Sequence, residues 1–195
     1  MNRTWNFEKG AWQAEDFLSA ASSRVEYRLT FGQKDDCIHN EGADKMDEYA
    51  YVSMVHRTPV SLPCLLETEC SFRTYGAPLL ILADAVDTLP DGRLQYGHHI
   101  EVVGWEKGIN VWDLTPDPEA PNGQRTVNLG RFSFPIEDGA RFLLTARADR
   151  QGLVVGAEVN GRSAQFDCPC VLPEKCYVGI TACEGENYFY RFYIR

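Results

Sequence analysis

The residues best suited to chemistry lie within residues 95–114, QYGHHIEVVGWEKGINVWDL. His99 and Glu101 stand two residues apart there, a spacing that brings both side chains to one face of a β-strand. A carboxylate beside an imidazole can orient it as a general acid or base near neutral pH. Trp105 and Trp112 follow, and an indole offers a flat apolar face on which a ring can stack. These residue types predict a cleft that grips a polar, ring-shaped ligand such as a sugar.

The element that must position these residues is a predicted β-hairpin. Runs of β-branched and aromatic residues flank a short polar turn, EKG at residues 106–108, which is typical of a hairpin. With Lys107-Gly108 as the two-residue loop, Glu101 is expected to pair with Leu114, and Val103 with Trp112.

The two faces of this hairpin are expected to differ in character, because side chains alternate across a strand. The core face carries Ile100, Val102, Ile109 and Val111, and the opposite face carries His99, Glu101, Val103, Trp105, Asn110 and Trp112. We take His99 and Glu101 as candidate catalytic residues, and Trp105, Asn110 and Trp112 as candidate substrate-binding residues. Two alternatives stay open: the histidine is a structural residue bonded to a backbone carbonyl, or the indoles are edge packing beneath a loop.

Two further polar pairs are candidate substrate-binding residues. Glu69 and Arg73 share one face of a predicted strand, as a pair across the cleft or as a surface ion pair that contributes little to stability. Glu184 and Asn187 lie between the last two predicted strands, either as ligand contacts or as a plain polar turn. No nucleophilic serine elbow, P-loop or dinucleotide fingerprint occurs in the sequence.

Charge and composition exclude several classes of partner. The chain of 195 residues has a formal net charge of −9 and no cluster of Lys and Arg, whereas nucleic acids and anionic membranes need a positive footprint. No apolar run is long enough to cross a bilayer, and the N-terminus lacks the apolar core of a secretory signal. The sequence therefore predicts a cytoplasmic protein with a neutral, small carbohydrate ligand.

The seven cysteines are an odd number in a chain without a secretory signal, which favours reduced, buried thiols; they are Cys37, Cys64, Cys70, Cys168, Cys170, Cys176 and Cys183. Cys168 and Cys170 with Cys176 lack the paired C-x-x-C spacing of a zinc site. We therefore predict no metal ligands and no cofactor. The acidic stretch 32–48 reads as a long loop without EF-hand spacing, and a structural calcium ion stays open there.

Strand signals recur along most of the chain, and no amphipathic helix of normal length appears. Period-2 or continuous apolar patterns predict strands at 24–31, 48–57, 64–73, 77–86, 124–135, 141–148, 153–159, 175–183 and 188–195, besides the central hairpin. We expect an all-β fold, a jelly-roll β-sandwich of two antiparallel sheets. The domain is expected to span residues 1–195, with an extended N-terminal segment tied down by aromatic residues.

This order of elements resembles a known group. A YVGI strand at 177–180 after the Asn160-Gly161 hairpin, followed by a final alternating strand, resembles the concanavalin A-like lectin/glucanase jelly roll. More narrowly, residues 77–84 followed by HIEVVGW at 99–105 are similar to 3-keto-disaccharide hydrolase-like domains. Their mid-chain strand carries a Glu followed by Val and a polar residue; Glu101 matches the Glu, and Val103 stands at the polar position.

The same strand is similar to that of laminarinase-type glucanases, whose E-x-D-x-x-E motif supplies nucleophile, helper and acid. Glu101 and Glu106 keep the outer carboxylates, and Val103 replaces the central Asp. The resemblance implies an enzyme that cleaves a glycosidic bond, by hydrolysis or by elimination on an oxidised sugar. The missing Asp leaves two alternatives: a non-catalytic, lectin-like carbohydrate-binding domain, or a structural subunit that can form a homo-oligomer.

Overall fold

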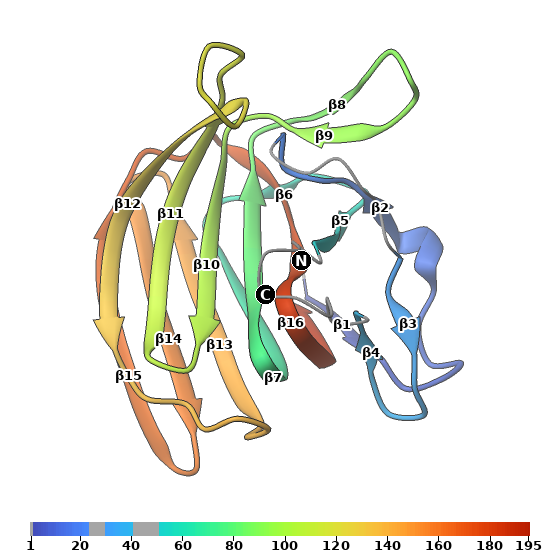
Figure 1. The fold of residues 1–195 in the computed structure, drawn as a ribbon, viewed down its shortest axis with the longest axis vertical. Helices are drawn as coiled ribbons and strands as arrows, with labels where there is room; N and C mark the ends of the chain where they lie inside the picture. The colour runs from blue at the N-terminus through green and yellow to red at the C-terminus, as the bar shows by residue number, and fades with distance from the viewer. Residues whose placement is uncertain (1, 24–29, 41–50) are drawn as a thin grey trace.

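The computed structural model describes residues 2–23, 30–40 and 51–195, and the chain forms two packed β-layers (Figure 1). The strand predicted at 24–31 and much of the acidic stretch 32–48 lie outside the described residues. Within the described part the one helical element is a 3-10 turn, Ala14–Asp16. No helix in this part is long and apolar enough to cross a membrane.

One layer, the front sheet, contains the predicted hairpin. Its strands run in the order β12 (Gln124–Ser133), β11 (Gly108–Pro116), β10 (His99–Trp105), the second half of β7 (Cys64–Ala83), the first half of β16 (Lys175–Ile194), β5 (Val52–His56) and β2 (Phe17–Ser19). All of these pairings are antiparallel, as predicted.

The other layer, the back sheet, lies behind β10–β12 in Figure 1. Its strands are β15 (Arg162–Pro169), β14 (Gly152–Val159), β13 (Phe142–Asp149), the first half of β7, the second half of β16 and β1 (Arg3–Asn6). Short strands complete the edges: β3 (Gly32–Gln33), β4 (Ile38–His39), β6 (Val60–Ser61) and the hairpin of β8 (Val86–Thr88) with β9 (Leu94–Tyr96). The jelly-roll sandwich predicted from the strand signals is confirmed.

The two layers are joined by a ribbon of the two longest strands, β7 and β16, which pair along almost their whole length. Residues 64–70 of β7 pair with β13 in the back sheet, and residues 79–83 pair with β10 in the front sheet. The ribbon bends between these parts, where Thr74, Tyr75 and Glu184 take positive φ angles of 51°, 62° and 60°. A Cβ on Gly185 would lie 1.7 Å from the carbonyl oxygen of Thr74, so only glycine fits this close approach.

The bend corrects two predicted boundaries. The strands predicted at 64–73 and 77–86 are one strand, and so are those at 175–183 and 188–195. The turn-like residues between them bend the ribbon without ending it, because both strands deform at the same level. The stretch 183–188 is therefore part of a ladder, with a register shift between Glu184 and Glu186, and not a free loop.

The main core lies between the two sheets and confirms the predicted core face of the hairpin. Ile100, Val102, Ile109 and Val111 are all fully buried in it. A second, smaller cluster covers part of the outer face of the front sheet, where Leu79 and Ile81 pack under Ala21, Tyr51 and Tyr96. All seven cysteines are free thiols and six of them are buried.

Candidate functional site

The hairpin β10–β11 has its predicted faces but not its predicted register. Glu101 pairs with Trp112 and Val103 with Asn110, so the two-residue loop is Glu106-Lys107. The shift is two residues, which keeps every side chain on its face. Gly108 belongs to the returning strand instead: its φ is 138°, and a Cβ there would lie 2.0 Å from the carbonyl oxygen of Phe132 on β12. The glycine therefore serves the close approach of β12 and not the turn.

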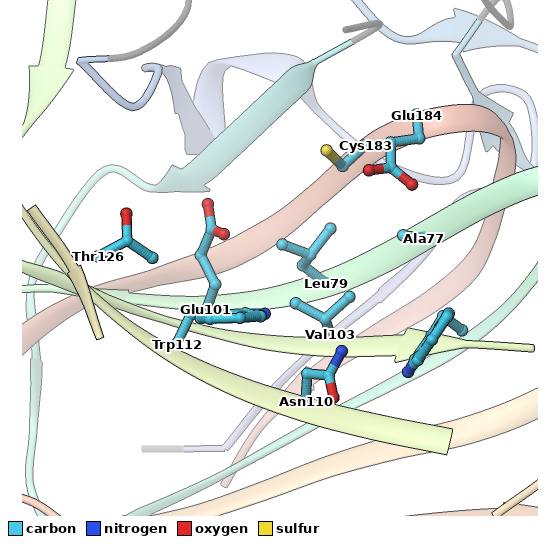
Figure 2. A pocket seen from close by; sticks show the side chains of 10 residues that line it. Ala77, Leu79, Glu101, Val103, Asn110, Trp112, Thr126, Cys183 and Glu184 are labelled. Carbon is cyan, nitrogen blue, oxygen red and sulfur yellow. The ribbon is translucent and has the colours of Figure 1, made fainter. Parts of the chain in front are cut away.

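A pocket of about 320 Å³ opens on the outer face of the front sheet, and we call it the outer-face pocket (Figure 2). Five strands line it: β7 with Ala77 and Leu79, β10 with Glu101, Val103 and Trp105, β11 with Asn110 and Trp112, β12 with Thr126, and β16 with Cys183 and Glu184. Of the nine predicted site residues, five line this pocket: Glu101, Trp105, Asn110, Trp112 and Glu184.

Glu101 is the carboxylate set into the pocket wall. Its side chain points off the sheet on the same side as Leu79 and Val103 (Figure 2), yet it is only 2% exposed. Tyr51 donates its hydroxyl hydrogen to Oε1 of Glu101 over 3.1 Å. A buried carboxylate needs such donors to remain charged, so Tyr51 both holds and stabilises this group.

His99 lies behind Glu101 and outside the pocket wall. Its ring is fully buried and tilts against Tyr96, with 5.3 Å between ring centroids. Nδ1 lies 2.9 Å from the carbonyl oxygen of Gly97, which makes Nδ1 the protonated, donating nitrogen. Nε2 is 3.8 Å from Oε1 of Glu101, longer than a hydrogen bond. This geometry places His99 to influence Glu101, and it keeps the imidazole away from any ligand in the pocket.

A polar network lies beside this pair on the same face. The hydroxyl oxygen of Ser53 lies 2.5 Å from that of Tyr96 and 2.5 Å from that of Thr181. All three residues are buried. Because each hydroxyl can both donate and accept, the three hydroxyls can bond one another in a row. This network holds the hairpin β8–β9 over the sheet, and with it the Tyr96 ring that packs against His99.

Asn110 and the two indoles line the pocket together with Glu101. Trp112 is the cross-strand partner of Glu101, and Asn110 is that of Val103. Asn110 is 7% exposed, and its Oδ1 accepts a hydrogen bond of 3.0 Å from Nε of Arg131. Trp105 and Trp112 are half-buried. The Trp105 ring has Lys107 Nζ 5.3 Å from its centroid and the Arg131 guanidinium 6.0 Å away. The pocket thus combines an amide, two indoles and the carboxylate of Glu101, with two cations near Trp105.

Glu69 and Arg73 do not line the pocket. Glu69 lies on the outer face of the back sheet, 3.6 Å from Arg191 and 3.8 Å from Arg141, as members of surface ion pairs. Arg73 is exposed near the bend of the ribbon. β7 alternates as predicted, but its first half belongs to the back sheet. Glu69 therefore belongs to a surface ion-pair network with Arg141 and Arg191, which is the kind of role that the sequence left open as the alternative to a cleft pair.

Asn187 is structural in this geometry. It is fully buried, and its amide nitrogen donates to the carbonyl oxygens of Cys183 and Gly185 over 3.0 and 3.2 Å. Its backbone N–H donates to Oδ1 of Asn40 over 2.7 Å. These bonds satisfy the backbone where the ribbon bends, a task for which a buried amide suits well.

Glu106, the second carboxylate of the glucanase-like strand, also stays outside the pocket. It occupies the hairpin loop with 47% of its side chain exposed, and Lys107 Nζ lies 3.6 Å from its carboxylate. The two outer carboxylates retained in the sequence therefore do not meet over one ligand position. Among the described residues no group of three or more His, Cys, Asp or Glu side chains is arranged to hold a metal ion.

Sequence reasoning missed Tyr51, Thr126 and Arg131. Tyr51 is 50 residues from Glu101, and no local pattern links them. Thr126 and Arg131 reach this face because β12 pairs with β11 and because β12 contains a bulge, with Val111 opposite Gly130 but Trp112 opposite Asn128. A bulge shifts the alternation by one residue, which a period-2 pattern cannot show.

Comparisons with solved structures agree with this architecture. β-Agarase A from Zobellia galactanivorans aligns with a TM-score of 0.63 at 6% identity, over 100% of this chain and 92% of the agarase. Carbohydrate binding module CBM66 from Bacillus subtilis gives 0.59 at 10% identity, over 89% and 91%. Lectin II from Ulex europaeus gives 0.58 at 9% identity, over 100% and 97%. No protein-family profile and no curated protein sequence matches the chain. The chain has the concanavalin A-like lectin/glucanase jelly-roll fold.

Proposed function

We propose that the outer-face pocket binds a saccharide. The observation that carries this proposal is the composition of one wall: half-buried Trp105 and Trp112 stand beside the buried carboxylate of Glu101 and the buried amide of Asn110. Indole faces pack on the apolar face of a sugar ring, while carboxylate and amide groups bond its hydroxyls. The solved structures of the same fold include a galactose-bound lectin and an oligoagarose-bound agarase, which supports a saccharide as the ligand class.

Cleavage of a glycosidic bond is the second candidate, and the setting of Glu101 favours it. A buried carboxylate, held by Tyr51 and backed by His99, is suited to exchange a proton with a ligand. Glycosidases ordinarily use two carboxylates flanking the scissile bond. Glu184 is the other carboxylate in the pocket wall, and it stands at the exposed rim. Binding is therefore the first conclusion, and catalysis by Glu101 is the role that E101Q tests.

Binding is tested by a glycan array followed by calorimetric titration of the selected saccharide. We expect Trp112→Ala to weaken binding by about thirtyfold or more, as for an aromatic anchor worth at least about 2 kcal/mol. Trp12→Ala is the matched control, because Trp12 is also half-buried but packs against Phe7 and Phe17, outside the outer-face pocket. Equal affinity in wild type and Trp112→Ala, or loss with Trp12→Ala alone, would contradict the site.

Catalysis is tested on the saccharide that binds. Prolonged incubation followed by chromatography and mass spectrometry shows whether a glycosidic bond breaks. If the wild type releases product, Glu101→Gln should abolish release while the bound saccharide remains detectable. Product formation that is unchanged in Glu101→Gln would remove Glu101 from any chemical step, and binding without product would leave a lectin-like role.

A further inference from the structure

Hydrogen-bond acceptors and hydrogen-bond donors lie on different sides of the outer-face pocket. At one side Glu101 offers carboxylate oxygens, which accept hydrogen bonds. At the other side stand Asn110 and Trp105, next to the cations Arg131 and Lys107. A ligand that satisfies both sides must present hydroxyl donors to Glu101 and an acceptor to Asn110.

The orientation of the Asn110 amide is fixed by chemistry. Nε of Arg131 is a donor only, so the atom that it contacts at 3.0 Å must be the amide oxygen. The amide nitrogen then faces the other way, and Figure 2 shows it on the pocket side of the strand. Asn110 therefore offers only N–H donors to a ligand. The indole Nε1 of Trp105 adds another donor, buried and without a hydrogen-bond acceptor among the described residues.

Arg131 owes its place on this face to the bulge in β12. Asn128 stands opposite Trp112, and Arg131 stands opposite Asn110, so one extra residue lies between them. Without that extra residue Gly130 would face the pocket side and Arg131 would point into the core. Bulges of this kind re-aim side chains and are common beside functional sites. The bulge thus places a cation beside Asn110.

The charge of Arg131 is available to a ligand. Its Nε bonds the neutral amide of Asn110, and among the described residues no carboxylate lies within ion-pair distance of its guanidinium. Its guanidinium carbon lies 6.0 Å from the centroid of the Trp105 ring, which lines the pocket. A guanidinium with free terminal N–H groups prefers a carboxylate, because it can donate two parallel bonds.

We infer that the outer-face pocket takes an acidic saccharide, with the carboxylate of a uronic acid unit held by the Asn110 amide nitrogen beside Arg131. The inference rests on the proposed function and adds the ligand class. The ring hydroxyls of the same unit then face Glu101, and its apolar face packs on the indoles. A neutral hexose lacks the charge that this end of the pocket complements.

The test compares ligands that differ only at carbon 6. The probes are the methyl glycosides of galacturonic and glucuronic acid, with the matching methyl galactoside and glucoside, titrated at pH 7.5 and low salt. We expect at least one uronate to bind about tenfold tighter than its neutral partner, as for one charge-assisted pair. Arg131→Met and Asn110→Asp should each erase that preference. Arg125→Met, also exposed on β12, is the control and should retain the preference.

The outcomes separate the inference from the proposal beneath it. Equal binding of uronate and neutral glycoside, or a uronate preference that survives Arg131→Met, overturns the acidic ligand and leaves saccharide binding intact. Tighter binding of methyl N-acetylglucosaminide, unaffected by Arg131→Met, does the same and points to an amide carbonyl as the acceptor. If no saccharide of either class binds, the proposed function fails, and this inference fails with it.

Discussion

Tyr51 donates a hydrogen bond of 3.1 Å to Glu101, from a residue 50 positions earlier in the chain. The bond joins the smaller hydrophobic cluster, to which Tyr51 belongs, to the carboxylate in the pocket wall. Both residues are buried, so removing the donor leaves a carboxylate oxygen with less compensation in a poorly solvated place. Burial of an incompletely bonded charge is costly.

Tyr51→Phe should therefore lower both stability and ligand affinity. Loss of a hydrogen bond to a charged group costs roughly 1.5–3 kcal/mol, which urea denaturation measures directly. Affinity for the saccharide should fall as well, because Glu101 is no longer held in place. Tyr75→Phe is the control, since Tyr75 is 60% exposed and its change should leave both quantities as they are. An unchanged free energy of unfolding in Tyr51→Phe would show that the bond contributes nothing.

Trp112 and Ile109 lie on opposite faces of one strand, and their truncation should have opposite signatures. Ile109→Ala empties a fully buried core position and should cost about 2–5 kcal/mol of stability. Trp112→Ala removes an indole that lines an open pocket, so it should cost less stability and abolish most of the binding. A melting temperature that falls more for Trp112→Ala than for Ile109→Ala would place the indole in the core.

Gly108→Ala should be more damaging than an ordinary glycine replacement at positive φ. Gly92 has a φ of 82° with open space around its Cβ position, so Gly92→Ala should cost only about 1–2 kcal/mol of backbone strain. Gly108→Ala adds a collision with the Phe132 carbonyl group at 2.0 Å, which pushes β12 away from β11. Equilibrium unfolding should show the larger loss, and saccharide affinity should fall with it because Arg131 lies on β12. Equal losses in the two variants would mean that β12 adjusts freely.

The buried thiols should make the protein less stable in alkali. Burial raises the pKa of the Cys176 thiol to about 12 and that of Cys64 to about 11, from the ordinary value of 9.0. Above pH 9 the folded state therefore keeps these thiol protons, whereas the unfolded chain loses them. Their contribution to stability is complete below pH 9 and declines as the pH rises from 9 to about 11 for Cys64 and to about 12 for Cys176.

Urea unfolding at pH 7.5 and pH 10 measures this decline. The double variant Cys64→Ala/Cys176→Ala is expected to be less stable at pH 7.5 but to lose less between the two pH values. A decline of the same size in the double variant would assign the alkaline sensitivity to other groups.

The sequence predicted the parts of this molecule that follow local periodicity. The faces of β10 and β11, the inward residues of β7 and the jelly-roll class all follow from period-2 alternation, which survives the two-residue error in register. That error arose because Gly108 resembles a turn glycine, whereas the close approach of β12 requires it. The sequence pattern of β10 and β11 alone cannot predict how closely β12 approaches them.

The residues that complete the pocket depend on contacts between distant segments. Tyr51 reaches Glu101 from another part of the chain, and Arg131 faces the pocket only because of a bulge. The pattern at 64–73 shows that Glu69 and Arg73 share a face, but it cannot show that this half of β7 belongs to the back sheet while only the second half reaches the front sheet. Asn187 follows Glu184 and therefore resembles a ligand contact, but its amide instead donates to the carbonyl oxygens of Cys183 and Gly185 where the ribbon bends.

The four indole N–H signals of the chain test the central claim most directly. In a ¹⁵N-labelled sample, each signal is assigned by a Trp→Phe replacement, and the uronate and neutral glycosides are then titrated in turn. Saccharide binding in the outer-face pocket predicts that the signals of Trp105 and Trp112 shift in a saturable way while those of Trp5 and Trp12 stay in place. Shifts confined to Trp5 or Trp12, or no saturable shift with any saccharide, would contradict the account.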